Sequence, residues 1–323
     1  MLGNFKKAIF RVLCLGCVLI GGGLMAEPNP EELFNLGMLS YDKQDFSKAR
    51  KYFEKACELK DGGGCFNLGR LYYYGEGVEK DFKKAFALFE KACDLNNSGG
   101  CGTLGMLYKF GQGVEKNLIK AYQFYSKACE LEDGRGCDAL GGLYEDGQGV
   151  EKNLTKAAYF YAKACDLNNG GGCATLGMLY EDGQGVGEDL TKATQFYSKA
   201  CDLNNGGGCF RLGVLYEFGQ GVEKNLIKAA YFYSKACDLK EGRGCSNLGS
   251  LYRDGQGVEK NLTKAAQLYS KACDLNNSVG CGALGMLYEF GQGVEEDLTK
   301  AAYFYSKACK LGFQKTCEIL KEK

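Results

Sequence analysis

The chain has 323 residues, with 48 glycines, 18 cysteines, 2 prolines and no histidine. Glycine and cysteine are far above ordinary usage, which favours a repetitive architecture over ordinary globular domains. The 40 Lys and Arg residues balance 40 Asp and Glu residues and are interspersed with them. The charge pattern therefore excludes the basic surface typical of nucleic-acid-binding proteins, and no nucleic-acid partner is predicted.

The N-terminal segment has the pattern of a secretory signal peptide. An apolar run over residues 12–24 is followed by the small residue Ala26 and preceded by three basic residues, Lys6, Lys7 and Arg11. We expect residues 1–26 to be cleaved after Ala26, leaving a mature protein that is periplasmic or secreted and has no permanent membrane anchor. The alternative is a lipoprotein acylated on Cys17, although Arg11 leaves little apolar core before it. Sixteen cysteines remain beyond this segment.

The rest of the chain is a tandem repeat with a step of 36 residues, which is the distance between successive Leu-Gly dipeptides. These start at Leu68, Leu104, Leu140, Leu176, Leu212, Leu248 and Leu284. With a shorter first copy over residues 31–64 the array has eight repeats, and residues 311–323 are expected to form a closing helix. Periods of roughly 20 to 50 residues are typical of solenoids, so we expect one domain over residues 27–323.

Each repeat is expected to contain two helices. In one copy, residues 137–145 place Leu and Tyr side chains on one face at helical spacing, and Gly147 suits a helix C-terminus. After the turn GQGVEK, Asn153 can cap a second helix over residues 154–167. We name these helix A and helix B. No segment alternates as a strand does, so the prediction is an all-α, right-handed solenoid of about eight helix-turn-helix repeats.

The repeat resembles known families. Leu-Gly-x-x-Tyr in helix A, followed by Ala, Tyr and Ala in helix B, is similar to the tetratricopeptide repeat with four additional loop residues. The GQGV loop and the 36-residue step resemble the Sel-like repeat (SLR) class, and a Cys-x7-Cys pair in every copy resembles the Helicobacter cysteine-rich protein family. The resemblance covers residues 31–323. Members of that family are often classed as β-lactamases or penicillin-binding proteins.

Two cysteines eight positions apart mark each turn from helix B to the next helix A. Asn and Gly residues between them can adopt left-handed conformations that reverse the chain, so that the two sulfurs meet. Metal binding is disfavoured by this spacing and by the absence of histidine, and the one C-x-x-C pair expected of redox sites lies inside the signal peptide. We therefore predict structural disulfides, with no metal and no cofactor. The pairs are Cys57–Cys65, Cys93–Cys101, Cys129–Cys137, Cys165–Cys173, Cys201–Cys209, Cys237–Cys245, Cys273–Cys281 and Cys309–Cys317.

The helix A positions that differ between copies fall on the face opposite the Leu and Tyr core. If helix A lines the concave side, as in tetratricopeptide arrays, this face is a groove for extended peptides. Asn35 and Asn67 would clamp a peptide backbone, while arginines would bind a carboxylate and methionines would give adaptable apolar contact. The alternative is that these positions face solvent and drifted after duplication. The candidates are Asn35, Asn67, Arg70, Thr103, Met106, Thr175, Met178, Arg211, Val214, Asn247, Ser250, Arg253 and Met286.

No catalytic residue is predicted. Residues 40–43 read SYDK and match the S-x-x-K motif of serine β-lactamases, but the S-D-N and K-T-G motifs are absent. The absence of histidine excludes zinc β-lactamase sites and the Ser-His-Asp and Cys-His arrangements. The GQGV loops follow no strand and precede no G-K-[ST], so they are interpreted as turns and not as phosphate-binding loops.

The sequence thus predicts a secreted interaction module that acts through the helix A face. Its candidate partners are extended peptides or proteins, among them host proteins met by a bacterium, and peptidoglycan fragments. One alternative is a β-lactam-binding protein with weak β-lactamase activity, which rests on the family resemblance. The other is an envelope spacer without a ligand.

Overall fold

The computed structural model describes residues 29–322, and the predicted signal peptide, with Cys14 and Cys17, lies outside them. The described part contains seventeen α-helices and no strand. None of these helices has both the length and the apolar character needed to cross a membrane. They are α1 (Pro30–Asp42), α2 (Phe46–Glu58), α3 (Gly62–Tyr74), α4 (Phe82–Asp94), α5 (Ser98–Phe110), α6 (Leu118–Glu130), α7 (Gly134–Asp146), α8 (Leu154–Asp166), α9 (Gly170–Asp182), α10 (Leu190–Asp202), α11 (Gly206–Phe218), α12 (Leu226–Asp238), α13 (Gly242–Asp254), α14 (Leu262–Asp274), α15 (Ser278–Glu289), α16 (Leu298–Lys310) and α17 (Gln314–Glu322).

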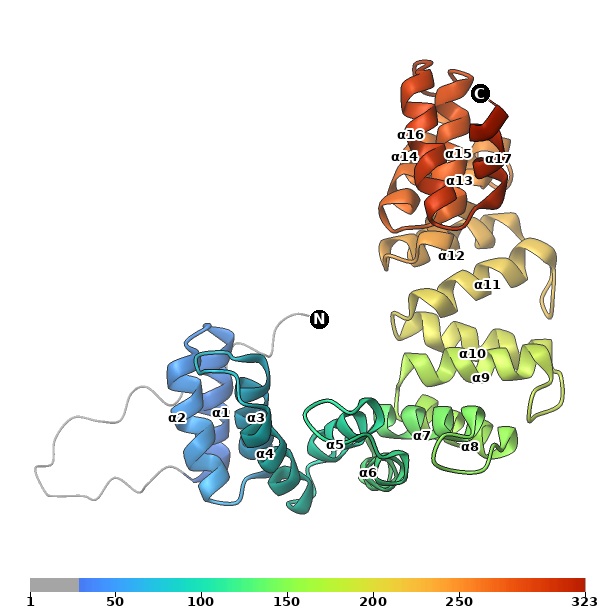
Figure 1. Cartoon of the computed structure of the whole chain (residues 1–323). Helices are drawn as coiled ribbons and strands as arrows, with labels where there is room; N and C mark the ends of the chain where they lie inside the picture. The colour runs from blue at the N-terminus through green and yellow to red at the C-terminus, as the bar shows by residue number, and fades with distance from the viewer. Residues whose placement is uncertain (1–28, 323) are drawn as a thin grey trace, which may run out of the picture.

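The helices form consecutive pairs that stack into a solenoid, as Figure 1 shows. Odd-numbered helices up to α15 are the predicted helices A, and even-numbered helices are the predicted helices B. Each helix packs mainly on its neighbours in the chain, and helices far apart in the sequence do not pack on each other. The prediction of an all-α solenoid of helix-turn-helix repeats is confirmed.

Local signals in the sequence place the ends of the helices. The side chain of Asn153 accepts a hydrogen bond from the backbone amide of Lys156 at 2.9 Å and so caps α8. Asp or Asn caps every helix from α1 to α16 in this way, except α13, which Glu241 caps. Gly147 ends α7 with a φ of 70°, a left-handed conformation that glycine adopts without steric cost.

The core of each repeat is built from leucines of helix A and from alanine and tyrosine of helix B. In the pair α7 and α8, the side chains of Leu140, Leu143, Ala157 and Tyr161 are all at most 5% exposed. Gly141 lets the two helices approach, because a Cβ atom at this position would lie 2.8 Å from the ring of Tyr161. These small and large residues alternate across the interface as close packing requires.

The turn from helix B to helix A differs in one respect from the prediction. Helix α9 begins at Gly170, so the glycines before Cys173 form its first turn and do not reverse the chain. The residue with left-handed backbone is Asn168, with a φ of 60°. The glycines serve close packing instead, since a Cβ atom on Gly172 would lie 2.6 Å from the Cβ atom of Ala164.

Eight disulfides close these turns, in the pairing that the sequence predicted. Their Cα–Cα distances lie between 4.5 and 4.9 Å. The first seven each join the last turn of one helix B to the start of the next helix A. The last one, Cys309–Cys317, ties α17 to α16.

Candidate ligand-binding groove

The predicted site residues lie on one type of helix, the odd-numbered helices. Successive odd-numbered helices pack on each other along the whole array, as α7 does on α9 and α11 on α13, and no two even-numbered helices approach as closely. Helices on the inner side of a curved stack lie closer together than those on the outer side. The odd-numbered helices therefore line the inner side. We call the surface formed by the second, fifth and eighth residues after the helix A cysteine the helix A face.

At the N-terminal end of this face, Asn67 and Arg70 bind each other. The guanidinium of Arg70 donates to the Asn67 side-chain oxygen at 3.2 Å and lies over the ring of Tyr41, 5.6 Å from its centroid. The Asn67 amide donates to the Gly63 carbonyl of its own helix at 3.0 Å, and the residue is only 9% exposed. A peptide backbone would have to displace these contacts, whereas Asn35 is exposed and accessible.

In the middle of the array the face carries charged and apolar groups side by side. The guanidinium of Arg211 on α11 lies 3.7 Å from the carboxylate of Glu181 on α9, an ion pair that bridges two repeats. Met178 is 39% exposed and Met286, further along, is 48% exposed. Thr175, one turn before Met178, is half-buried.

Several of the remaining predicted residues are already engaged within the protein. The Ser250 hydroxyl lies 3.0 Å from the hydroxyl of Tyr269, and Asn247 hydrogen-bonds Tyr233. Arg253 makes two hydrogen bonds to Asp254, at 2.7 and 2.8 Å. Val214 packs partly buried against the core. These side chains shape the face more than they offer free hydrogen-bonding groups.

A row of tyrosine–glutamate pairs was missed by the sequence analysis. The buried tyrosine of helix B reaches the helix A face, where its hydroxyl donates to a glutamate eight residues after the helix A cysteine. Burial, together with this hydrogen bond, raises the pKa of Tyr161 well above its usual value. The regular separation of 16 residues between partners is the signal that could have found them. The pairs are Tyr161–Glu145, Tyr197–Glu181, Tyr233–Glu217 and Tyr305–Glu289.

Two predicted residues, Thr103 and Met106 on α5, line a cavity of about 240 Å³ between α5 and α7. Its other walls include Tyr125, Arg135 and Ala139. This cavity opens on the helix A face, because Thr103, Met106 and Ala139 hold the second and fifth positions after their helix A cysteines. Its size is suited to one amino-acid side chain.

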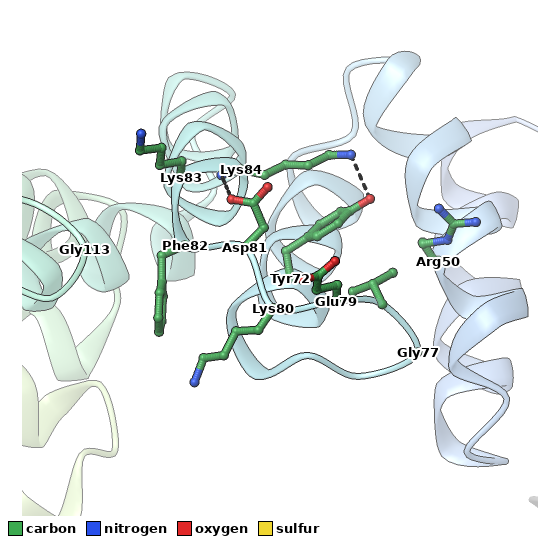
Figure 2. A pocket seen from close by; sticks show the side chains of 11 residues that line it. Arg50, Tyr72, Gly77, Glu79, Lys80, Asp81, Phe82, Lys83, Lys84 and Gly113 are labelled. Carbon is green, nitrogen blue, oxygen red and sulfur yellow. Dashed lines mark hydrogen bonds between the residues drawn. The ribbon is translucent and has the colours of Figure 1, made fainter.

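A second hollow, of about 930 Å³, lies where the turn before α4 faces α2. In Figure 2, Arg50 approaches it from α2, while Lys84 reaches the Tyr72 hydroxyl at 2.7 Å and Asp81 accepts from the Lys84 backbone amide. The Nε atom of Arg50 is buried and has no hydrogen-bond partner among the described residues. This hollow is lined by turn residues, by α2 and α4 and by Tyr72 of α3, and Tyr72 is the seventh residue after the helix A cysteine, so the hollow is not part of the helix A face.

Ser40, the serine of the SYDK match, is not placed as a nucleophile. Its side chain is only 6% exposed, and its hydroxyl donates to the Leu36 carbonyl at 2.8 Å. A serine nucleophile needs an accessible oxygen and a base beside it. The motif match therefore has no support from the local geometry.

Comparison with known proteins now identifies the architecture. The family model of the Sel1 repeat matches residues 63–97, 103–133, 135–169, 172–205, 207–241, 242–277 and 278–313. The chain belongs to the Sel1 repeat family. A tetratricopeptide repeat matches the first copy, over residues 30–62. The predicted resemblance to Sel-like and tetratricopeptide repeats is confirmed.

Curated relatives include two proteins of Helicobacter pylori. Over 80 residues, a quarter of the chain, this Sel1 repeat protein is 65% identical to HcpC and 56% identical to Beta-lactamase HcpA. The matched segment spans only 27% of HcpC and 32% of HcpA. The predicted relationship to the Helicobacter cysteine-rich proteins is confirmed over that segment.

Solved structures show the same fold over most of the chain. A protective antigen of uropathogenic Escherichia coli with an SLR fold is 26% identical, with a TM-score of 0.62, over 91% of this chain and 71% of the antigen. A Sel1 repeat protein from Oxalobacter formigenes is 22% identical, with a TM-score of 0.69, over 91% of this chain and 86% of that one.

Proposed function

We propose that this Sel1 repeat protein is a secreted or periplasmic interaction module that binds extended peptides or proteins along the helix A face. The observation that carries the proposal is the mixed chemistry of that face. Exposed Met178 and Met286 lie on the same surface as the ion pair of Arg211 and Glu181. Flexible apolar groups beside charged groups suit a face that binds protein segments.

The cellular setting is part of the same proposal. Eight disulfides require an oxidising compartment, which agrees with export directed by residues 1–26 and a mature solenoid over residues 27–323. Host proteins and peptidoglycan fragments are the partners that a bacterial protein would meet there.

Peptide binding tests the proposal with two variants, each of which removes the cation of one ion pair. Arg211→Ala removes a cation from the helix A face, whereas Lys199→Ala removes one from the even-numbered helix α10, where Lys199 lies 3.5 Å from Asp166. Peptides selected from a library on the oxidised protein should bind Arg211→Ala about tenfold more weakly, because a charge-assisted hydrogen bond is lost. Lys199→Ala should bind them as the unmodified protein does. Equal binding by all three proteins would contradict a role for the helix A face.

β-Lactam hydrolysis is the second candidate, favoured by the name of the relative HcpA. The test is turnover of a chromogenic β-lactam by the oxidised protein and by Ser40→Ala. Because the Ser40 hydroxyl is buried and bonded to a carbonyl, we expect no turnover that depends on it. Turnover that survives Ser40→Ala and is lost in Arg211→Ala would make the helix A face an enzymatic site.

A further inference from the structure

In three repeats the chain places a phenylalanine of its own beside the helix A face. The residue directly after the helix A cysteine position places its ring against the buried aromatic ring of the following helix B. We call this space the aromatic slot. The ring pairs and their centroid distances are Phe34–Phe53 at 6.2 Å, Phe66–Phe89 at 5.8 Å and Phe210–Tyr233 at 5.9 Å.

On α5 the same position holds Gly102, so the slot has no ring. A Cβ atom on Gly102 would find its nearest neighbours, Ala128 and Asp133, only at 3.9 Å. The space left open is the cavity of about 240 Å³ over Tyr125. The cavity is thus an empty copy of a slot that other repeats fill with a phenyl ring.

One of the three filled slots is covered by a cation, and the empty slot has a counterpart of that cation. In the slot filled by Phe210, the guanidinium of Arg243 lies 4.5 Å from the centroid of the ring. It is held there by Glu241 at 2.8 Å. In the empty slot, Arg135 occupies the position of Arg243 in the repeat and is held by Asp133 at 3.2 Å. Arg135 lines the cavity, so a cation is available to stack on an incoming aromatic ring.

The empty slot also lacks a carboxylate that the slot of Phe210 has. There Glu217 accepts the hydroxyl hydrogen of Tyr233. In the repeat of α5, the residue eight positions after the cysteine is Lys109. The Tyr125 hydroxyl has no hydrogen-bond partner among the described residues. It is also not fully buried, and Tyr125 lines the cavity. It is a hydrogen-bond donor that faces the cavity.

Burial of Tyr125 keeps this donor protonated. Burial raises the pKa of Tyr125 to about 12, so the hydroxyl keeps its proton at any physiological pH. Lys109 is close to Asp138: burial raises the pKa of Asp138, Glu145 adds to this effect and the Lys109 ammonium opposes it. Lys109 stands at the position where four other repeats carry the glutamate that binds the helix B tyrosine.

We propose that the cavity over Tyr125 binds an aromatic side chain of a peptide, with a carboxylate beside that side chain. The ring of the ligand lies between Tyr125 and the Arg135 guanidinium, as the Phe210 ring lies between Tyr233 and Arg243 in its own repeat. The carboxylate of the ligand accepts a hydrogen bond from the Tyr125 hydroxyl, as Glu217 accepts one from Tyr233. The ligand thus supplies the two groups that this repeat lacks. The inference rests on the proposed peptide-binding function and names one side-chain site within it.

The probes are four labelled hexapeptides. Two end in phenylalanine, one with a free C-terminal carboxylate and one with a C-terminal amide, and a third ends in leucine with a free carboxylate. The fourth ends in phenylalanine amide and has glutamate before the phenylalanine. Fluorescence anisotropy with the oxidised full chain should show the free acid ending in phenylalanine binding at least about tenfold more tightly than the one ending in leucine, because only the aromatic ring stacks under a cation. The amide with glutamate distinguishes a side-chain carboxylate from a terminal one. Equal affinity for the phenylalanine and leucine acids would overturn the proposal.

Gly102→Phe fills the cavity with a ring of the chain itself, and three other repeats show that phenylalanine is accommodated at this position. Its matched control is Ala174→Phe, at the same position of α9, which leaves the cavity over Tyr125 open. Gly102→Phe should abolish the preference for phenylalanine, and Ala174→Phe should retain it. Retention of the preference in Gly102→Phe would place the aromatic site elsewhere and overturn the proposal.

Tyr125→Phe is a second variant that alters no packing, since Phe89 stands naturally at the same position of α4. It should weaken binding of the phenylalanine acid about tenfold and leave the amide unchanged, because only the hydroxyl is removed. Equal weakening of acid and amide would show that the hydroxyl does not bind a carboxylate. Library peptides that bind through Arg211, together with probes that bind Gly102→Phe and the unmodified chain equally, would support the proposed function and contradict the side-chain site. If neither the library peptides nor the probes bind, both proposals are contradicted.

Discussion

Single glycines set how closely the helices of this protein approach. On α7, a Cβ atom at Gly141 would lie 2.8 Å from the ring of Tyr161, whereas at Gly142 it would meet only the Tyr161 hydroxyl oxygen at 3.6 Å. The first distance is too short for a real contact and the second is an ordinary van der Waals contact. Two adjacent glycines of one helix therefore have opposite tolerance for a methyl group.

Gly141→Ala should destabilise the protein by about 1–3 kcal/mol, because the buried ring of Tyr161 has no room to move. Gly142→Ala should stabilise it by about 0.5–1 kcal/mol, because alanine favours the helix and costs no packing. Urea unfolding of both variants under oxidising conditions measures the two effects. A destabilising Gly142→Ala would show that the two positions do not differ as the distances indicate.

At the scale of the element, the disulfide and the close glycine act on the same turn. Cys165 and Cys173 join α8 to α9, and Gly172 beside them lies against Ala164. Only Asn168 needs the left-handed backbone in this turn. The turn is thus fixed by a covalent link, by one unusual dihedral angle and by tight backbone packing.

Replacing Cys165 and Cys173 together by alanine should lower the free energy of unfolding by about 2.5 kcal/mol, which is the chain-entropy value for a ring of this size. Urea unfolding without reductant measures the loss. In excess reductant, where all eight links are open, the variant and the unmodified chain should have similar stability. A difference that persists in reductant would assign the loss to the packing of the two side chains and not to the covalent link.

The sequence predicted what is local within one repeat. The helix caps such as Asn153, the terminating Gly147 and the cysteine pairs are each read from a few neighbouring residues, and the period showed where each recurs. The tyrosine–glutamate pairs were missed because the partners lie on different helices, and the eighth position by itself is only variable. The role of the glycines before Cys173 was also missed, because close approach to Ala164 is a property of packing and not of the turn.

The candidate site shows the same limit. The sequence placed Thr103 and Met106 on the helix A face, but the cavity between them and Tyr125 depends on Gly102, which stands where three other repeats carry phenylalanine. That conclusion needs the three-dimensional correspondence between repeats. The roles of the other groove candidates stay predictions.

Across the whole molecule, buried tyrosines of the helices B run along the array from Tyr125 to Tyr305. Burial raises the pKa of each, to about 12 for Tyr125 and further for Tyr161 and its counterparts paired with glutamate. In the unfolded chain a tyrosine titrates near about 10. The folded state therefore binds these protons more tightly than the unfolded state does.

The sign of the pH dependence follows from this difference. A raised pKa in the folded state contributes stability that is fully present below about pH 10. Above that pH the unfolded chain releases protons that the folded chain retains, so this stability is lost as the pH rises toward 12 and beyond. The stability of the oxidised protein should thus fall steeply above about pH 10.

The variant Tyr125→Phe lacks one of these protons. The stability of the variant should therefore fall less steeply, by about one proton in the slope of unfolding free energy against pH. Urea unfolding at several alkaline pH values, followed by circular dichroism, measures both slopes. Lysines titrate equally in both proteins, so their contribution cancels in the difference between the slopes. Identical slopes would show that the Tyr125 hydroxyl is as easily ionised in the folded chain as in the unfolded one.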